Sequence, residues 1–363
     1  MSVKPALTTA VAQGLILIAL AAAFLPCSGT RAAPARLKPA PSAVILMYHR
    51  FGENTLPSTN IRLAEFEAHL SVLKSGPYHV LPLAGIVAAL AAGRPLPDRA
   101  VAITIDDAYL SVYREAFPRL RAAGLPFTLF VATDPLDQKL PGFMSWDQLR
   151  EIVAGGATVG NHGASHAHML NASPRQNRRD IAKGMRRIGE ELGIKPQFFA
   201  YPYGEYRTAF FDRLEKAGIR AAFAQYSGVA YGGSPLMALP RFALNEKYGG
   251  LDRFRLIVDT LPIPATEITP SDPDLAGEAN PPAFGFTLSE EVPGIAALQC
   301  FPSHIDAPGR IDRIGTRRIE VRLGRPFPPG RGRINCTSPG PGERWRWLGA
   351  PFFVPGGDPA DRK

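Results

Sequence analysis

The sequence predicts an α/β fold, built as a mostly parallel barrel or sheet and followed by a small all-β module. Two observations support this prediction. From about residue 43 to residue 260, apolar runs rich in β-branched residues alternate with segments of helical period, a pattern typical of parallel strands with crossover helices. From residue 283 to residue 355, short alternating or aromatic segments are separated by Gly and Pro, which indicates a small β domain.

The predicted strands of the first region are short apolar runs, several of which end in polar residues. Buried parallel strands are expected to look like this because both of their faces are covered. The runs lie at residues 43–49, 99–105, 126–132, 157–162, 197–204 and 220–226.

The predicted helices lie between these strands. Residues 66–73 and 111–123 have apolar side chains at helical spacing. Ser145 begins a capping box, because a Gln follows three residues later. Ser173 precedes a Pro and a long charged segment that continues to about residue 192, which predicts a further helix.

The composition changes again after the α/β region. Residues 266–282 contain several prolines and no periodicity, so they are expected to form a linker between a domain at 36–265 and a β-rich accessory domain at 283–363. Cys300 and Cys336 would remain as a pair in the mature protein. In an oxidising compartment the simplest expectation is a disulfide between them.

The first 35 residues are interpreted as a secretory signal peptide. The apolar run at 14–25 is too short to span a bilayer, and a small, Ala-rich stretch follows it. Two alternatives stay open, namely an uncleaved membrane anchor and a lipid attached to Cys27. The signal peptide predicts that the protein is secreted or periplasmic.

The chain is basic, with 41 Lys and Arg against 32 Asp and Glu. A positive balance favours anionic surroundings, such as polymers or headgroups of the cell envelope. The basic residues are scattered and form no stripe or known motif, so nucleic acid is not expected as a partner. The oligomeric state cannot be read from the sequence.

Polar residues of metal-ligand type follow three of the predicted strands. Asp106 and Asp107 end one strand, His162 and His166 follow another, and His49 ends the first. Two imidazoles spaced i and i+4, together with a carboxylate, make a three-ligand set that leaves a position open for water. The ends of parallel strands converge at one edge of the sheet, so these side chains are expected to meet.

These motifs resemble those of the polysaccharide deacetylases, the NodB-homology or carbohydrate esterase family 4 enzymes. The family's first motif, T-F-D-D-G, is matched by TIDDA at 104–108, and its second, H-S/T-x-x-H, by HGASH at 162–166. The third, R-x-P-x-G, is partly matched by AYPYG at 200–204. The resemblance covers roughly residues 43–260 and implies a distorted (β/α) barrel.

The resemblance also implies a role for each matched residue. Asp106 would be the general base, and Asp107 would bind a divalent metal together with His162 and His166. The expected metal is Zn²⁺, with Co²⁺ or Ni²⁺ as alternatives. A cation neutralises one carboxylate and leaves its neighbour free to take a proton from water. The backbone N–H of Tyr203 would stabilise the oxyanion that develops on an acetamide carbonyl.

The sequence departs from the family pattern at several positions. Ala108 replaces the Gly of the first motif, and Gly163 replaces a Ser or Thr that steadies the histidine loop. Ala200 stands where an Arg normally orients the base, so Arg241 is predicted as its substitute. The late histidine motif that supplies the general acid has no counterpart near residues 254–262.

His49 is predicted to be the missing general acid. Exopolysaccharide deacetylases that act on poly-N-acetylglucosamine resemble the same family with the motif order permuted, and they carry this histidine on the first strand. The segment LMYH at 46–49 resembles that arrangement. In a barrel the first and last strands are neighbours, so His49 could reach the same site.

Structural interpretations compete with these roles. Asp106 and Asp107 are also favourable residues at the start of a helix, and His49 could be a core histidine with satisfied hydrogen bonds. His168 is interpreted as a surface or supporting residue rather than a fourth ligand. Trp146 fits a platform for a sugar ring and a core residue equally well.

The expected function is metal-dependent hydrolysis of N-acetyl groups from an N-acetylated polysaccharide, with release of acetate. Two alternatives stay open. One is a non-catalytic carbohydrate-binding protein that keeps the fold, and the other is an O-acetyl esterase acting on a cell-wall glycan. The sequence does not choose among peptidoglycan, poly-N-acetylglucosamine and chitin-like substrates.

Overall fold

The computed structural model describes residues 1–4, 40–275 and 280–356. The predicted signal peptide lies, from residue 5 onward, outside the described residues. The described residues from 40 onward belong to one compact unit. Within the described part of the chain, no helix combines the length and the apolar character that a membrane crossing requires.

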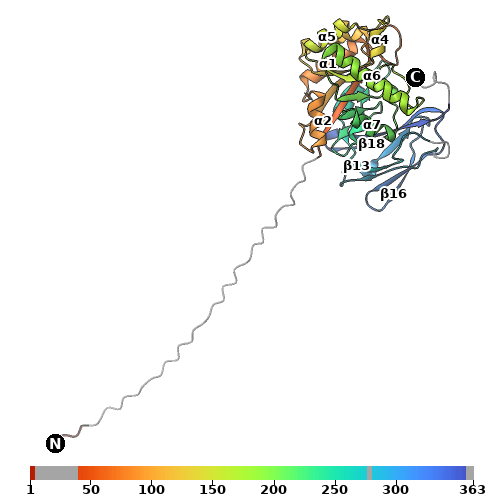
Figure 1. Cartoon of the computed structure of the whole chain (residues 1–363). Coiled ribbons are helices and arrows are strands. Elements are labelled where there is room, and N and C mark those ends of the chain that lie inside the picture. Colours follow the sequence, from red (N-terminus) through yellow and green to blue (C-terminus); the bar gives the residue numbers. More distant parts are fainter. Residues whose placement is uncertain (5–39, 276–279, 357–363) are drawn as a thin grey trace. The chain divides into compact units, whose positions relative to one another are not determined.

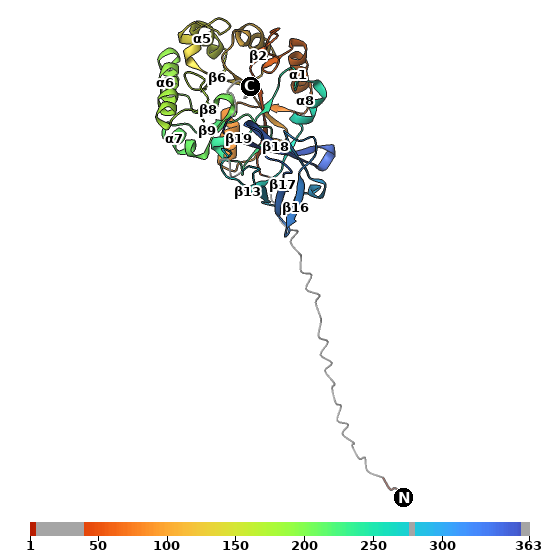
Figure 2. The ribbon, with the colours of Figure 1, turned by 90° about the vertical axis from the view of Figure 1, so that its right-hand side faces the viewer.

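The largest sheet is curled and mostly parallel, and helices lie around its outside (Figure 2). Its strand order is β10-β1-β5-β6-β7-β8-β9, with β11 added beside β1 and β4 beside β5. All of these pairings are parallel except the one between β1 and β10. The strands are β1 Ser42–Tyr48, β4 His79–Val80, β5 Ala100–Asp106, β6 Phe127–Val131, β7 Thr158–Asn161, β8 Phe198–Ala200, β9 Ala221–Phe223, β10 Ala230–Tyr231 and β11 Phe242–Ala243.

The helices connect these strands and bury their apolar faces against the sheet. Ser145 forms the predicted capping box, and Ser173, predicted as a helix start, forms a second one. In each box the serine hydroxyl accepts a hydrogen bond from a backbone N–H three residues later. The helices are α1 Leu63–Ser75, α2 Leu83–Ala91, α3 Phe117–Ala123, α4 Thr133–Asp137, α5 Trp146–Ala154, α6 Pro174–Leu192, α7 Phe211–Lys216 and α8 Leu251–Val258. The α/β fold class predicted from the sequence is confirmed.

The segment after β5 does not use the two acids as a helix cap. All seven residues of β5 are buried, and the strand is followed by a turn at Asp107 and Ala108. Helical structure begins at Leu110 and continues through η1, Val112–Ala116, a π-helical turn that leads into α3. The N-cap residue of η1 is Ser111, so Asp106 and Asp107 remain available at the end of the strand.

The C-terminal part consists of two four-stranded sheets, to which β13, β16 and β18 in Figure 1 belong. One has the order β12-β19-β18-β15 and the other β13-β14-β17-β16. Cys300 and Cys336 lie opposite each other in the register of β15 and β18 and form a disulfide. The strands are β12 Leu261–Pro262, β13 Ala265–Thr269, β14 Phe284–Leu288, β15 Gln299–Pro302, β16 Arg310–Ile314, β17 Arg318–Arg322, β18 Gly330–Pro339 and β19 Trp345–Val354.

The C-terminal sheets share apolar contacts with the barrel. Strand β12, which directly follows the barrel, pairs in parallel with β19. Phe353 of β19 is 5% exposed and belongs to the same apolar cluster as Phe199 and Tyr206 of the barrel. Trp347 packs edge-on against Phe242, with ring centroids 5.3 Å apart. The start of the segment predicted as a linker is ordered as β13, which pairs with β14.

Candidate active site

The predicted site residues lie at one edge of the curled sheet, because parallel strands all end there. His49 follows β1, Asp106 is the last residue of β5, and His162 follows β7. Tyr203 follows β8. Arg241 is the exception, since it precedes β11 and reaches Asp106 with its long side chain. The register of the parallel pairs places these strand ends next to one another.

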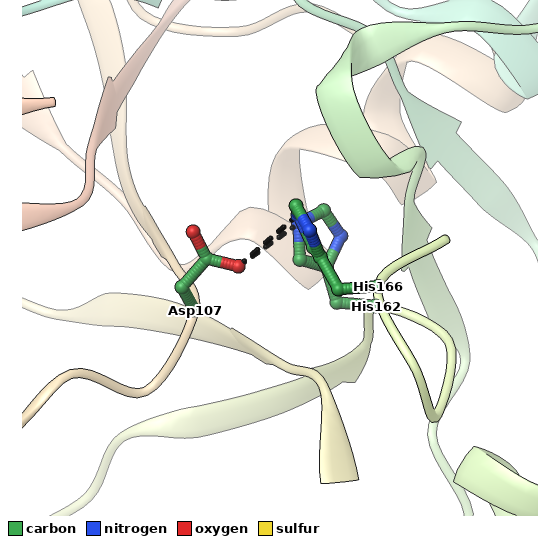
Figure 3. Close-up of side chains that lie close together, drawn as sticks. All are labelled: Asp107, His162 and His166. Carbon is green, nitrogen blue, oxygen red and sulfur yellow. Dashed lines mark ion pairs between the residues drawn. The ribbon is translucent and has the colours of Figure 1, made fainter. Parts of the chain in front are cut away.

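Asp107, His162 and His166 form a group that could hold a metal ion. Both imidazoles face the same carboxylate oxygen of Asp107 (Figure 3). Nε2 of His162 lies 3.5 Å from Asp107 Oδ1, and Nε2 of His166 lies 3.3 Å from it. His162 is fully buried and Asp107 almost so, whereas His166 is partly exposed. The group is therefore reachable from one side.

The hydrogen bonding of His162 fits a cation. Its Nδ1 lies 2.7 Å from the carbonyl oxygen of Ala200 and must donate to it, because a carbonyl can only accept. Nε2 then carries a lone pair that points toward Asp107, and this buried atom has no hydrogen-bond partner among the described residues. Burial lowers the pKa of His162 to about 4, so the ring is neutral at pH 7.

Two lone-pair atoms facing each other without a proton repel unless a positive charge lies between them. Two ligands on a tetrahedral Zn²⁺ with bonds of about 2.1 Å are roughly 3.4 Å apart, close to the 3.3 and 3.5 Å found here. Asp107, His162 and His166 therefore have the donor chemistry and spacing that a divalent ion requires.

The backbone around the triad adopts left-handed conformations. Asp107 has φ +70°, His166 has φ +54°, and Tyr203 has φ +58°. This conformation costs free energy for a residue other than glycine, and residues that adopt it cluster at functional sites. Here hydrogen bonds hold the loops, since the N–H groups of Asp107 and His162 donate to the carbonyls of β6 residues Phe130 and Val131.

Asp180 of α6 steadies the histidine loop. Its carboxylate accepts hydrogen bonds from the backbone N–H groups of Ala164 (3.0 Å) and Ser165 (2.9 Å). Gly163 has φ +76°, and a Cβ there would lie 2.4 Å from Asp180 Oδ2. Asp180 can approach the loop this closely because Gly163 has no side chain. Asp180 is not among the predicted site residues, because nothing in the sequence connects this helix residue with the histidine motif.

Asp106 is held by Arg241. The guanidinium donates two hydrogen bonds to the carboxylate, at 2.7 and 2.8 Å, and both side chains are fully buried. A further donor of Arg241 binds the carbonyl of Ala224, which fixes the orientation of the guanidinium. Burial raises the pKa of Asp106, but the charge of Arg241 and the neighbouring His162 outweigh burial and lower it to about 2. Asp106 is therefore ionised at neutral pH.

His49 also lies beside the carboxylate of Asp106, although it is far from Arg241 in the sequence. His49 Nε2 is 3.8 Å from Asp106 Oδ2, and the imidazole is 12% exposed. Burial lowers the pKa of His49, while Asp106 and Asp107 oppose this effect. His49 therefore lies beside Asp106, and its imidazole is partly open to solvent.

Tyr203 is held by two partners, His168 and Arg331. Its ring stacks on His168 with centroids 3.7 Å apart, and His168 Nδ1 lies 2.9 Å from the buried carboxylate of Glu205. Arg331, from β18, donates a 2.8 Å hydrogen bond to the carbonyl of Tyr203. Nothing in the sequence could link Arg331 to this loop, because 128 residues separate the two.

Trp146 lies at the start of α5, apart from the triad. Its indole N–H donates to Asp137, and the guanidinium of Arg187 lies over the ring. The indole also packs against the main apolar cluster. These contacts are those of a structural residue.

The fold and the site together define a hydrolase of barrel type, and residues 93–222 match the family model described as polysaccharide deacetylase. This match covers about a third of the chain, which is similar to polysaccharide deacetylases over that range. The matched range includes both acids, both histidines of the triad and Tyr203, whereas His49 and Arg241 lie outside it.

Three proteins illustrate the similarity. YxkH of Bacillus subtilis is 25% identical over 206 residues, which are 57% of this chain and 72% of YxkH. The poly-beta-1,6-N-acetyl-D-glucosamine N-deacetylase of Escherichia coli is 25% identical over 224 residues, which are 50% of this chain and 33% of that enzyme, so the match spans a third of its length. The structure of IcaB from Ammonifex degensii superposes with a TM-score of 0.55 at 28% identity, covering 61% of this chain and 98% of IcaB.

Proposed function

We propose that the protein is a metal-dependent N-deacetylase of an N-acetylated polysaccharide. The observation that carries the proposal is the inequality of two adjacent acids. Asp106 is kept ionised by Arg241, which donates to both of its carboxylate oxygens, whereas Asp107 offers one oxygen to both histidines. One acid is thus suited to accept a proton and the other to bind a cation.

The proposed reaction adds water to the acetamide carbonyl and breaks the C–N bond, which yields acetate and a free amine. A divalent ion bound by Asp107, His162 and His166, with Zn²⁺ preferred over Co²⁺ or Ni²⁺, would polarise the carbonyl and acidify water. Asp106 takes the proton from the attacking water, and the backbone N–H of Tyr203 stabilises the developing oxyanion. His49 gives a proton to the leaving amine.

The relatives guide the choice of substrate and location. The E. coli relative is named for poly-β-1,6-N-acetylglucosamine, and we propose a glycan of this kind as substrate. We also propose export to the periplasm or the cell exterior by a signal peptide at 1–35, and association with the envelope through the basic surface. The proposed domain boundaries stay at 36–265, 266–282 and 283–363.

The proposal is tested by acetate release from N-acetylglucosamine oligomers. Chelation should abolish the activity, and Zn²⁺, Co²⁺ or Ni²⁺ should restore it. Asp107→Ala should reduce kcat/KM by at least about 100-fold, since it removes a ligand, while Asp212→Ala on the exposed surface of α7 should leave it unchanged. Full activity of Asp107→Ala would refute the ligand assignment. Release from O-acetylated xylan, but not from the N-acetylated oligomers, would identify an esterase instead.

Metal binding can be measured without any substrate. An ion that binds only the folded chain raises its stability by about 4 kcal/mol at a thousand times its Kd. We expect Zn²⁺ to raise the Tm of the chelated wild-type protein and to leave the Tm of Asp107→Ala almost unchanged. An equal rise in both proteins would mean that zinc binds elsewhere.

A further inference from the structure

A cavity lies beside the candidate active site, between the barrel and the C-terminal sheet. Its volume is about 170 Å³. The barrel contributes Glu205 and Arg207, and the C-terminal part contributes Asp274, Arg331 and Phe353. Cavities that hold drug-sized ligands are about 300–1,000 Å³. This one therefore suits a single ring rather than a large ligand.

The charges around the cavity balance each other. Glu205 is 1% exposed and binds His168, while Arg207 pairs with Asp274 at 2.9 Å. With Arg331, the lining has two carboxylates and two guanidinium groups. A neutral ligand with many hydroxyl groups can bind both kinds of group, whereas a free anion or cation would meet a repelling partner.

The lining also combines an unsatisfied donor with an aromatic floor. Nε of Arg207 is buried and has no hydrogen-bond partner among the described residues. Phe353, although only 5% exposed, adds an apolar side to the lining at the same place. Planar polar side chains around an aromatic ring are suited to a sugar, which has hydroxyl groups at its rim and C–H groups on its faces.

The cavity is connected to the triad through Tyr203. Arg331 binds the Tyr203 carbonyl, and Glu205 binds His168, on which the Tyr203 ring stacks. The opposite neighbour of the Tyr203 ring is His166, with centroids 4.5 Å apart. A ring in the cavity would therefore lie one side chain away from the place where the acetamide reacts.

We propose that this cavity is a subsite for a sugar unit next to the one that is deacetylated, built jointly by the barrel and the C-terminal β-sheet. The proposal rests on the proposed function. The C-terminal part is then a component of the substrate groove, and it makes the protein prefer longer oligomers.

The experiment compares the full-length protein with two variants of the subsite. Arg331→Ala removes a donor, and Leu170→Trp places a large ring at the cavity wall, where Leu170 is a lining residue. Arg313→Ala is the matched control, because this arginine lies on exposed β16 and binds the carbonyl of Ile295. Thermal unfolding verifies that each variant is folded.

Two measurements are made on N-acetylglucosamine oligomers of two to five units. The first is the ratio of kcat/KM for the pentamer to that for the dimer. It should fall about tenfold in Arg331→Ala, as expected for one lost charged hydrogen bond. It should also fall about tenfold in Leu170→Trp, whose ring would occupy the cavity, and should stay at the wild-type value in Arg313→Ala. A simple loss of stability would lower both rates and leave the ratio unchanged.

The second measurement is the Kd for the pentamer by calorimetry, which needs no turnover. The Kd should rise about tenfold in both variants. Unchanged ratios and unchanged Kd values in the two variants overturn the subsite, as does a wild-type protein that binds no oligomer. The wild type could also bind the pentamer without releasing acetate. If the two variants weaken that binding, the subsite is supported and the proposed deacetylase activity is refuted.

Discussion

At the scale of single residues, the site depends on how two identical side chains acquire different properties. Asp106 and Asp107 are adjacent in the chain, yet the left-handed turn at Asp107 sends their carboxylates to different partners. Arg241 holds one and two imidazoles face the other. The sequence could predict this division only from the resemblance, because the partners come from strands far away in the chain.

Arg241 should control the acidic limit of activity. The pKa of Asp106 is about 2, so its carboxylate is ionised at neutral pH. In Arg241→Met the buried carboxyl loses its counter-charge and binds a proton at higher pH. The acidic limb of the pH profile of kcat/KM should therefore move up by about one to three pH units.

Arg241→Lys is the matched variant for this prediction. It keeps the positive charge and loses the paired hydrogen bonds, so its acidic limb should move less. Breaking a buried ion pair costs about 3–5 kcal/mol, and the profile must be measured below the lowered Tm. An acidic limb that stays in place in folded Arg241→Met would contradict the role of Arg241.

At the scale of elements, strand order and helix starts were predictable, whereas the support of the loops was not. Alternating apolar runs and capping boxes are local signals, and the structure contains the strands and helices that they predict. The loss of Ser or Thr at Gly163 suggested a weakened histidine loop. The structure shows that Asp180, from the next helix, makes two hydrogen bonds to that loop, a contact that depends on how α6 packs.

Asp180→Asn should loosen the histidine loop. An amide can still accept through its oxygen, but its NH₂ group would face a backbone N–H, so one of the two hydrogen bonds is lost. We expect zinc affinity to fall by about 10- to 100-fold, as for other groups that orient metal ligands, measured by competition with a chelating dye. Glu190→Gln on the same helix is exposed and should change nothing. Equal affinities of Asp180→Asn and wild type would refute the role.

At the scale of the whole molecule, the barrel and the C-terminal sheets share an apolar cluster. The C-terminal sheets begin shortly before the change in composition near residue 266, with β12 and β13. Periodicity cannot reveal which surfaces meet, and the parallel pairing of β12 with β19 joins segments about 85 residues apart. Arg331 was beyond the reach of sequence reasoning for the same reason.

Phe353→Ala tests this common core. The side chain packs with Tyr206 of the barrel, and removal of a buried Phe costs about 3–5 kcal/mol. We expect one cooperative unfolding transition in wild type and variant, with a lower midpoint in the variant, measured in urea by circular dichroism and Trp fluorescence. Phe301→Ala, at a side chain that is 42% exposed, should have a small effect. Two separate transitions, with that of the barrel unchanged, would contradict the prediction.

The pair of Asp106 and Arg241 also bears on when the chain becomes active. The two residues are 135 positions apart, and they come from an early and a late strand of the same curled sheet. A chain that has not yet docked its late strand lacks the guanidinium that keeps the base charged. Under the proposed function, an exported chain would thus lack a charged base until this late segment has docked.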